Sequence, residues 1–246
     1  MDIALVYGTE RKGSTYNIAQ LFLNKLKDEK SEVTEIFLPR DMPHFCKGCS
    51  LCFMKGEEYC PDYEQVNKIS IALEKADLLI FASPVYVYHT TGQMKTLLDH
   101  FGYQWMVHRP NKTMFGKMAL VISTAAGAGM KSTNKDIADS LTFWGVARIF
   151  KYGKGVAAID WSGVSHKKKA AIYKDVDKIS ARIMRRSKNV TPSIKTKALF
   201  YAMRMAQKRG GFNKPDVEYW KEQGWLGNSR PWKQNTYTVK GKKNEI

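Results

Sequence analysis

The sequence predicts a doubly wound α/β fold, in which about five parallel strands alternate with helices. Residues 3–7, 77–83 and 117–123 are short apolar runs with the length and the β-branched content of buried parallel strands. Segments with helical character separate these runs. The loops that follow the runs are rich in Gly, Pro, Ser and Thr. In folds of this class, ligands bind where such loops leave the carboxyl ends of the strands.

The expected elements alternate along the first 186 residues. Apolar runs, and one apolar–polar alternation typical of a more exposed strand (32–38), indicate strands at residues 3–7, 32–38, 77–83, 117–123, 146–150 and 155–159. Helical stretches are expected at residues 18–26, 63–75, 94–101, 134–143 and 165–186, of which the last is basic. Because strands and helices alternate, a parallel sheet is the most economical architecture.

The loop Gly8–Asn17 has the composition of a phosphate-binding turn. A strand that leads into a Gly/Ser/Thr loop and then a helix leaves unpaired N–H groups at the positive end of the helix dipole. The loop matches neither Gly-x-Gly-x-x-Gly nor Gly-x₄-Gly-Lys-Ser/Thr, since Ser14 stands where the second motif has lysine. Hydroxyls at Thr9, Ser14 and Thr15, with Arg11 as a clamp, suit one terminal phosphate. The alternative is a plain turn in which Ser14 or Thr15 only caps the helix.

Two further loops are expected at the same edge of the sheet. Residues 84–93 follow the strand 77–83, and residues 124–129 follow the strand 117–123. Both contain Gly, Pro or small hydroxyl residues, which let the backbone approach a ligand closely. The three loops together predict one binding site at the carboxyl ends of the strands.

The net charge of +17 is concentrated in the C-terminal part of the chain. Residues 151–246 hold 23 Lys and Arg against 7 Asp and Glu, whereas residues 1–150 hold 17 and 16. Such a segment suits nucleic acid, an anionic membrane or a phosphorylated substrate, although a solvated face is commoner. Nucleic-acid binding ranks lowest, because no recognised reader motif is present. No apolar stretch reaches ~20 residues and no signal segment precedes the first strand, so a cytoplasmic location is expected.

We expect two regions: residues 1–187 form the ligand-binding domain, and residues 188–246 form a basic helical C-terminal extension. A helix is expected over 193–209, ended by two glycines, and a second one over 216–223. The extension could pack on the domain or on a partner subunit. It could instead form a lid over the ligand, or lie as an amphipathic helix on an anionic membrane. The candidate lid residues are Trp220, Trp225 and Trp232.

The motifs in the three loops are similar to those of the flavodoxin-like FMN reductases and, within them, of the iron-sulfur flavoproteins. The matching residues are Gly8-Thr9-x-Arg11-x-Gly13-Ser14-Thr15, Ser83-Pro84-Val85-Tyr86 with Met94, Lys95 and Asp99, and the Gly127/Gly129 loop. The resemblance covers residues 1 to about 187. It implies a flavodoxin-like five-stranded sheet, FMN as cofactor and NAD(P)H as co-substrate.

The resemblance also implies which residues bind FMN. The phosphate would be held by Thr9, Arg11, Gly13, Ser14, Thr15 and Asn17. The isoalloxazine ring would be lined by Pro84, Val85, Tyr86 and Val87 on one side and by Thr124, Ala125, Ala126, Gly127 and Gly129 on the other. Tyr86 and His89 are candidate catalytic residues, although hydride passes directly to the flavin and stacking matters more than a general acid. Arg109 is a candidate clamp for a charged substrate.

All four cysteines lie in one inserted loop, the cysteine loop (residues 44–61). Cys46, Cys49, Cys52 and Cys60 resemble the compact cluster motif of the iron-sulfur flavoproteins, which implies a [4Fe–4S] cluster. Structural zinc and free thiols remain alternatives, whereas disulfides are unexpected in a chain without an export signal. Gly48 and Gly56 give the loop the freedom to wrap around a cluster.

The sequence therefore supports three functions. The first is an NAD(P)H-dependent FMN oxidoreductase that reduces a quinone, a nitro or azo compound, free flavin or a metal ion. The second is an iron-sulfur flavoprotein that takes single electrons from ferredoxin. The third, in another class, is a non-redox adaptor whose basic tail contacts a membrane. The resemblance implies a homodimer or homotetramer with subunits meeting near the flavins.

Overall fold

The computed structural model describes residues 1–233, so the last thirteen residues of the expected extension lie outside the described part. Five parallel strands form one sheet in the order β2-β1-β3-β4-β5. The strands are β1 (Ile3–Tyr7), β2 (Val33–Phe37), β3 (Leu78–Pro84), β4 (Met118–Ala125) and β5 (Arg148–Gly155). This is the flavodoxin-like order, in which the chain changes direction between β1 and β3. The predicted fold class is confirmed.

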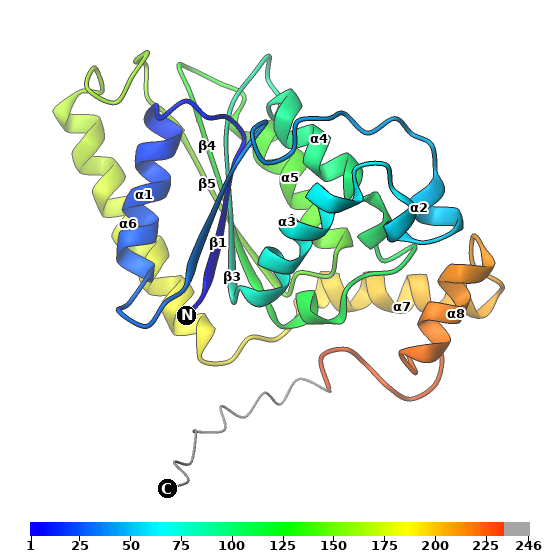
Figure 1. Ribbon diagram of the computed structural model, residues 1–246. Coiled ribbons are helices and arrows are strands. Elements are labelled where there is room, and N and C mark those ends of the chain that lie inside the picture. Colours follow the sequence, from blue (N-terminus) through cyan, green and yellow to red (C-terminus); the bar gives the residue numbers. More distant parts are fainter. Residues whose placement is uncertain (234–246) are drawn as a thin grey trace, which may run out of the picture.

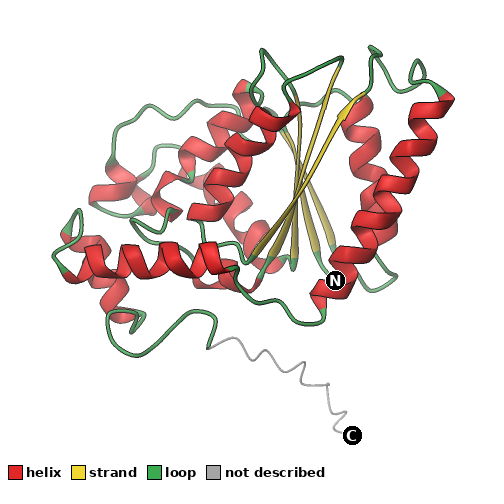
Figure 2. Cartoon of the chain, turned by 180° about the vertical axis from the view of Figure 1, so that it is seen from behind, coloured by secondary structure: helices red, strands yellow, loops and turns green. Residues whose placement is uncertain are grey.

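Helices cover both faces of the sheet (Figures 1 and 2). The helices are α1 (Ser14–Leu26), α2 (Leu51–Met54), α3 (Tyr63–Lys75), α4 (Gly92–His100), α5 (Met130–Phe143), α6 (His166–Ser187), α7 (Ile194–Lys208) and α8 (Lys214–Glu222). Helices α1 and α6 pack on one face, around Phe22 and Ile172. Helices α3, α4 and α5 pack on the other face, around Leu73, Leu97 and Leu141. Burial on both faces explains why the central strands are continuously apolar.

The strand expected at 155–159 is not formed. A single strand, β5, runs from Arg148 to Gly155 and pairs with β4 as far as Ala125. Beyond it, the N–H groups of Val156 and Ala157 donate to the carbonyls of Ala125 and Ala126, 2.8 and 3.1 Å away, and Ala157 has φ of +49°. The left-handed conformation of Ala157 ends the extended chain and turns this segment toward the loop after β4.

The C-terminal extension forms the two expected helices, α7 and α8. In Figure 1, α7 lies below the lower end of α5, and α8 lies below α2. They build a third core with the segment that precedes β4. Its buried residues are Met106, Phe115, Phe200, Trp220 and Trp225. The extension therefore packs on the domain, as one of the expected arrangements proposes.

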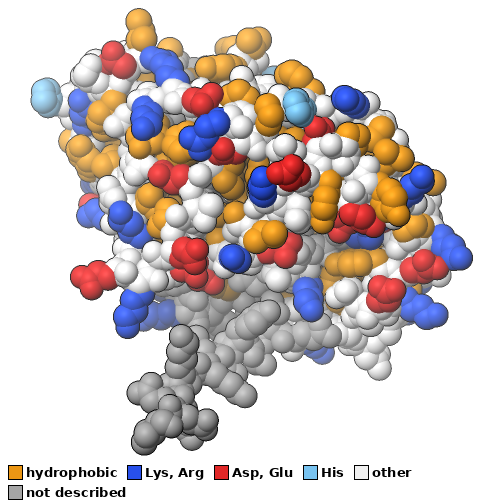
Figure 3. Space-filling model, in the orientation of Figure 1, with side chains coloured by type: hydrophobic (Ala, Val, Ile, Leu, Met, Phe, Trp, Pro, Cys, Tyr) orange, Lys and Arg blue, Asp and Glu red, His pale blue; other side chains and the backbone are white. Residues whose placement is uncertain are grey.

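Charged groups of both signs are interspersed on the face of the molecule that Figure 3 shows, rather than gathered in one basic patch. Helix α6 carries much of the positive charge, with Lys167, Lys168, Lys169 and Lys174 in its first half. Within residues 1–233, no helix is long and apolar enough to cross a bilayer.

Lys117 is buried at the start of β4, where its Nζ donates to the carbonyls of Glu74 and Ala76 at 2.7 and 2.5 Å. Burial lowers the pKa of Lys117, against the attraction of Asp77 and Glu74. The unfolded chain therefore binds this proton more tightly than the native protein does. Its contribution to the free energy of unfolding should rise with pH, between the lowered pKa and the ordinary value of 10.5.

Urea unfolding of the wild type and of Lys117→Met between about pH 8 and about pH 10 measures this contribution. As the pH rises, the free energy of unfolding of the wild type should increase relative to that of the variant. Equal pH slopes for the two proteins would show that Lys117 keeps an ordinary pKa in the fold.

Candidate flavin and cysteine sites

A cavity of about 160 Å³ opens at the carboxyl ends of the strands, at the upper edge of the sheet in Figure 1. The three predicted loops meet there. Of the predicted binding residues, those that line the cavity are Thr9, Arg11, Gly13, Ser14, Thr15, Pro84, Val85, Tyr86, Thr124, Ala125 and Ala126. The convergence follows from the topology, because β1, β3 and β4 are adjacent and parallel.

The start of α1 has the character of an anion site. Gly13 occupies the N-cap position, and no side chain among residues 1–233 caps the first turn. The alternative of a plain turn in which Ser14 or Thr15 only caps the helix is therefore wrong. The Ser14 Oγ is buried and has no hydrogen-bond partner within residues 1–233. A buried hydroxyl without a partner is costly. A phosphate oxygen at this point would satisfy both the hydroxyl and the free N–H groups of the first turn.

Arg11 lies across one side of the cavity. Its Nη2 donates to the carbonyl of Ile159, and its guanidinium approaches the Cα of Gly13 so closely that a Cβ there would lie 3.7 Å from Cζ. Val156, Ala158 and Ile159 also line the cavity. Sequence reasoning missed these three residues, because they were assigned to a strand.

Hydrogen bonds tie the loops to one another. The Thr91 Oγ1 donates to the carbonyl of Gly8 at 2.7 Å, and the Thr91 N–H donates to the Ser83 Oγ at 3.2 Å. On the other side, the Thr15 and Thr124 hydroxyls lie 2.6 Å apart. A Cβ at Gly8 would come within 2.8 Å of the Thr91 Oγ1, so only glycine permits this approach. The site is therefore held open by the fold itself.

A tight turn forms the outer wall. The backbone N–H groups of Tyr86 and His89 each donate to the other residue's carbonyl, at 2.9 and 3.1 Å. Val87 and Tyr88, between them, have φ of +47° and +65°, and Val87 is 94% exposed. A β-branched residue in this conformation is strained. The turn thus holds an apolar surface in water beside the cavity.

Four of the predicted FMN residues do not line the cavity: Asn17, Val87, Gly127 and Gly129. The Asn17 side chain donates to the carbonyl of Gly13 at 2.9 Å and so braces the first loop. Gly129 has φ of +97°, and a Cβ there would clash with Val85 at 2.5 Å. Asn17 and Gly129 therefore do not face the cavity but contact residues that line it, Gly13 and Val85.

Of the two candidate catalytic residues, Tyr86 lines the cavity at the strand ends and His89 does not. His89 lies in a neighbouring cavity of about 610 Å³ between α4 and α5. Its Nδ1 lies 3.0 Å from Asp136 Oδ2, an oxygen that also accepts the Thr90 N–H at 3.2 Å. This geometry suits a residue that fixes the turn.

The four cysteines line one small cavity in the cysteine loop, together with Phe53, Asp62 and His100. All four are free thiols, and Cys46 and Cys49 are exposed. Burial raises the pKa of Cys52 to about 11, and the proximity of Cys60, Cys46 and Cys49 adds to the rise. Gly48 and Gly56 have φ of +64° and +142°, so the glycines supply the bends that the sequence predicts. The donor set of four thiols around one cavity fits a cluster.

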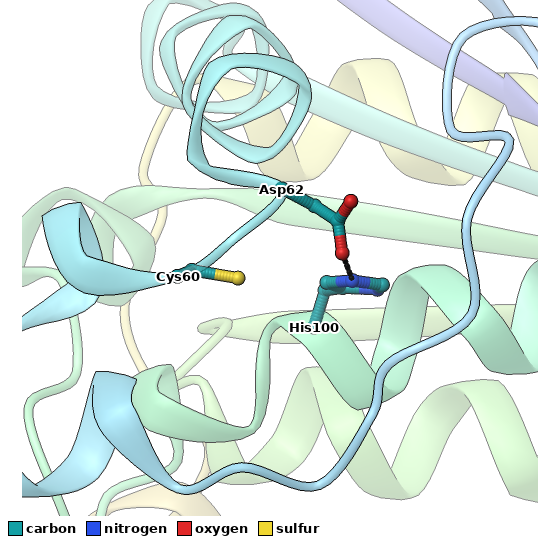
Figure 4. A group of neighbouring side chains, drawn as sticks. All are labelled: Cys60, Asp62 and His100. Carbon is teal, nitrogen blue, oxygen red and sulfur yellow. Dashed lines mark hydrogen bonds and ion pairs between the residues drawn. The ribbon is translucent and has the colours of Figure 1, made fainter.

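A buried histidine–aspartate pair, His100 and Asp62, lines this cavity beside Cys60 (Figure 4). The donor atoms of Cys60, Asp62 and His100 lie within 4.8 Å of one another. The His100 Nδ1 donates to the Thr96 carbonyl at 2.9 Å, and its Nε2 lies 3.1 Å from Asp62 Oδ2. Burial opposes ionisation of Asp62, but the hydrogen bonds from His100 and His44 keep the pKa of Asp62 below its usual value.

Arg109 is not available to clamp a charged substrate. Its side chain is 9% exposed and pairs with Asp216 of α8, with 2.6 Å between Nη1 and Oδ1. Trp220 and Trp225 are buried in the third core and do not line the cavity at the strand ends, so neither acts as a lid over it. Trp232 packs against the same core.

The strand order defines a flavodoxin-like protein, with a cavity at the strand ends beside the start of α1. A family model for NADPH-dependent FMN reductases matches residues 1–159, more than half of the chain, and the chain belongs to this family. The protein is therefore an NAD(P)H-dependent FMN oxidoreductase with FMN as cofactor. Family membership overturns the alternative of a non-redox adaptor.

Curated relatives and solved structures resemble this chain in sequence and in fold, respectively. An iron-sulfur flavoprotein of Archaeoglobus fulgidus is 27% identical over 228 residues, which cover 90% of this chain and 98% of the relative. One from Methanosarcina thermophila is 26% identical over 149 residues, 59% of this chain and 75% of the relative. An FMN-bound NADH-azoreductase of Bacillus anthracis superposes with a TM-score of 0.54 at 14% identity, over 74% of this chain and 99% of its own.

An NAD(P)H:quinone oxidoreductase of Methanothermobacter marburgensis superposes with a TM-score of 0.56 at 15% identity, over 75% of this chain and 97% of its own. At these identities the structures support the flavodoxin-like fold alone.

Proposed function

We propose that this reductase is an iron-sulfur flavoprotein, in which Cys46, Cys49, Cys52 and Cys60 hold a [4Fe–4S] cluster. It would exchange electrons with a one-electron carrier such as ferredoxin. The observation that carries this proposal is that all four thiols line one cavity. Bends at Gly48 and Gly56 separate Cys46 and Cys60 along the chain from the two middle cysteines. The names of the curated relatives support it.

The flavin would be held by the residues that line the upper cavity. The first turn of α1, with the hydroxyls of Thr9, Ser14 and Thr15, would bind the phosphate. Pro84, Val85 and Tyr86 would form the wall against the ring. When bound, FMN accepts a hydride as an electron pair and can release the electrons singly, which a four-cysteine cluster can exchange.

The residues around the flavin cavity have positioning tasks. Arg11 joins the first loop to the Ile159 carbonyl and so brings a positive charge to the phosphate end. The Thr91 hydroxyl joins the second loop to the Gly8 carbonyl of the first, and the Ser83 hydroxyl fixes Thr91 by accepting its N–H. No described side chain needs to move a proton for hydride transfer, so Tyr86 acts as a wall for stacking.

A second candidate function is direct reduction of a small acceptor, such as a quinone, a nitro or azo compound, free flavin or a metal ion. The exposed turn at Tyr86, Val87 and Tyr88 favours it, because it offers an apolar surface beside the cavity for a planar molecule. The names of an azoreductase and a quinone oxidoreductase among the structural neighbours are consistent with this class of acceptor. A homodimer or homotetramer stays a prediction, which sedimentation would test.

An anaerobic absorption spectrum with iron and sulfide analysis tests the two cofactors together. We expect flavin peaks, a broad shoulder, and about four iron and four sulfide per chain. Stopped-flow bleaching with NAD(P)H and with reduced ferredoxin then separates the donors. A protein with flavin but without iron after anaerobic reconstitution would leave the second candidate and reject the first.

Replacing Cys52 by Ser should abolish the iron-sulfur absorption and leave FMN binding unchanged. Cys52 is half-buried and lines the cysteine cavity, which shares no lining residue with the cavity at the strand ends. Ser50→Ala is a matched control, because Ser50 lines the same cavity without a thiol. Full retention of cluster iron in Cys52→Ser would remove this residue from the ligand set.

A further inference from the structure

The short helix α2 ends in carbonyls that its own turn cannot satisfy. It spans only Leu51–Met54, and the Lys55 N–H donates to the carbonyl of Leu51. The carbonyls of Cys52 and Phe53 follow in the last turn, where intrahelical donors are absent by geometry. Both are instead met by Arg109, which contacts the Cys52 carbonyl through Nη2 and the Phe53 carbonyl through Nη1, the latter at 3.3 Å. A cation at this end also complements the helix dipole.

Arg109 is held in turn by Asp216, in the first turn of α8. The Asp216 side chain is fully buried, and its two oxygens accept from Arg109 Nη1 at 2.6 Å and from His108 Nδ1 at 2.7 Å. Glu57 lies 3.8 Å from the same guanidinium. Removing one partner from such a buried pair leaves an uncompensated charge, which is strongly destabilising. The geometry of Arg109 is therefore set by the extension.

Further contacts from the extension fix the segment that carries Arg109. Side chains of α7 and α8 donate to three backbone carbonyls there: Gln207 to Val107, Trp220 to His108 and Tyr219 to Pro110, each at 2.7 Å. The extension also reaches the cysteine loop directly, because the Asn213 Nδ2 donates to the Phe53 carbonyl at 3.3 Å. The Phe53 ring packs on His108, with ring centroids 4.5 Å apart.

We propose that Arg109 and Asp216 are positioning residues, through which the C-terminal extension holds α2 and Cys52 in the shape that binds the cluster. This pair is called the clamp from here on. Neither residue lines the cavity at the strand ends, and neither touches a thiol sulfur in the described contacts. Arg109 instead contacts the backbone that carries Cys52. The part of this inference that concerns the cluster rests on the proposed function. The part that concerns the shape of the loop rests on the hydrogen bonds alone.

The experiment compares three substitutions in the full-length chain. Asp216→Asn keeps the shape and removes the charge, and Arg109→Gln removes the guanidinium. The matched control is Arg204→Gln, because Arg204 makes the same kind of contact inside the extension, to the carbonyls of Trp225, Leu226 and Gly227 at 2.8, 3.1 and 2.8 Å, and does not touch the cysteine loop.

Two readouts are measured. In metal-free protein, the rate at which iodoacetamide labels Cys52 is followed by mass spectrometry, with hydrogen exchange of residues 51–56. In reconstituted protein, the loss of iron to a chelator is followed. We expect both clamp variants to label Cys52 and to lose iron roughly 10- to 100-fold faster than the wild type. Arg204→Gln should stay within about twofold of the wild type on both rates.

The possible outcomes test the clamp and the proposed cluster independently of each other. If the wild type takes up no cluster, the proposed function fails while the labelling rates still decide whether the clamp exists. If the wild type binds a cluster and the clamp variants match it on both rates, the clamp is rejected. Equal acceleration in Arg204→Gln would also reject it, because general loosening of the extension would then explain the effect. If Asp216→Asn unfolds, Arg109→Lys replaces it, because lysine keeps the positive charge and loses the two-pronged guanidinium. Cys52 of this variant should be labelled at a rate between those of the wild type and of Arg109→Gln. A rate equal to that of the wild type would count against the clamp.

Discussion

Replacing Ser14 by Asp is expected to weaken FMN binding by at least about a hundredfold without destabilising the FMN-free protein. The new carboxylate would stand in the first turn of α1, beside the phosphate. Two like charges ~4 Å apart repel by about 4 kcal/mol at an effective dielectric constant of 20, which corresponds to roughly a thousandfold in affinity. Without FMN, the same carboxylate complements the positive end of the helix dipole.

Flavin fluorescence titration with FMN and with riboflavin measures the effect and its cause. Riboflavin has no phosphate, so its affinity should change little in Ser14→Asp. Ser14→Ala is the matched control, and the loss of one hydrogen bond to a charged group should cost about 1.5–3 kcal/mol of FMN binding. If FMN and riboflavin lost affinity equally, the substitution would be acting on the ring and the phosphate would lie elsewhere.

Replacing Phe200 by Ala should cost the extension about 3–5 kcal/mol of stability. Phe200 lies at the centre of the third core, with its ring centroid 5.0 Å from those of Trp220 and Trp232 and 5.6 Å from that of Trp225. We expect the amides of residues 194–233 to exchange faster with solvent while the strands of the sheet keep their protection.

Hydrogen exchange with mass spectrometry, together with an FMN titration, checks this expectation. Ile194→Ala is the control on the same helix, because Ile194 is 89% exposed, and it should change the stability by less than about 0.5 kcal/mol. Loss of FMN binding in Phe200→Ala would show that the domain does not fold independently of the extension, and would contradict a domain boundary near residue 187.

The sequence was sufficient to predict the fold and the upper cavity, because both follow from local pattern and topology. Buried parallel strands are readable as apolar runs, and the loops after adjacent strands must meet at one edge. Eleven of the fifteen predicted FMN residues line the cavity for this reason. The segment 156–159 was misread, because its apolar composition resembles a strand and its bend depends on the left-handed conformation of Ala157.

The role of Arg109 could not be predicted from the sequence. Its partner Asp216 is 107 residues further along the chain, and the carbonyls it contacts lie 56 and 57 residues before it. Neither distance leaves a periodic or local signal. From the sequence alone, an arginine near a candidate pocket indicated a residue that binds a charged substrate. In the structure, the packing of the extension buries Arg109 instead. Contacts of this kind depend on the assembled fold.

A crystal structure of the protein loaded with FMN would test the central claim most directly. We predict that the phosphate sits at the start of α1, within hydrogen-bond distance of the Ser14 hydroxyl and of the first backbone N–H groups of the helix, with the ring beside Pro84, Val85 and Tyr86. A phosphate bound at any other place, with the Ser14 hydroxyl still unpartnered, would contradict it.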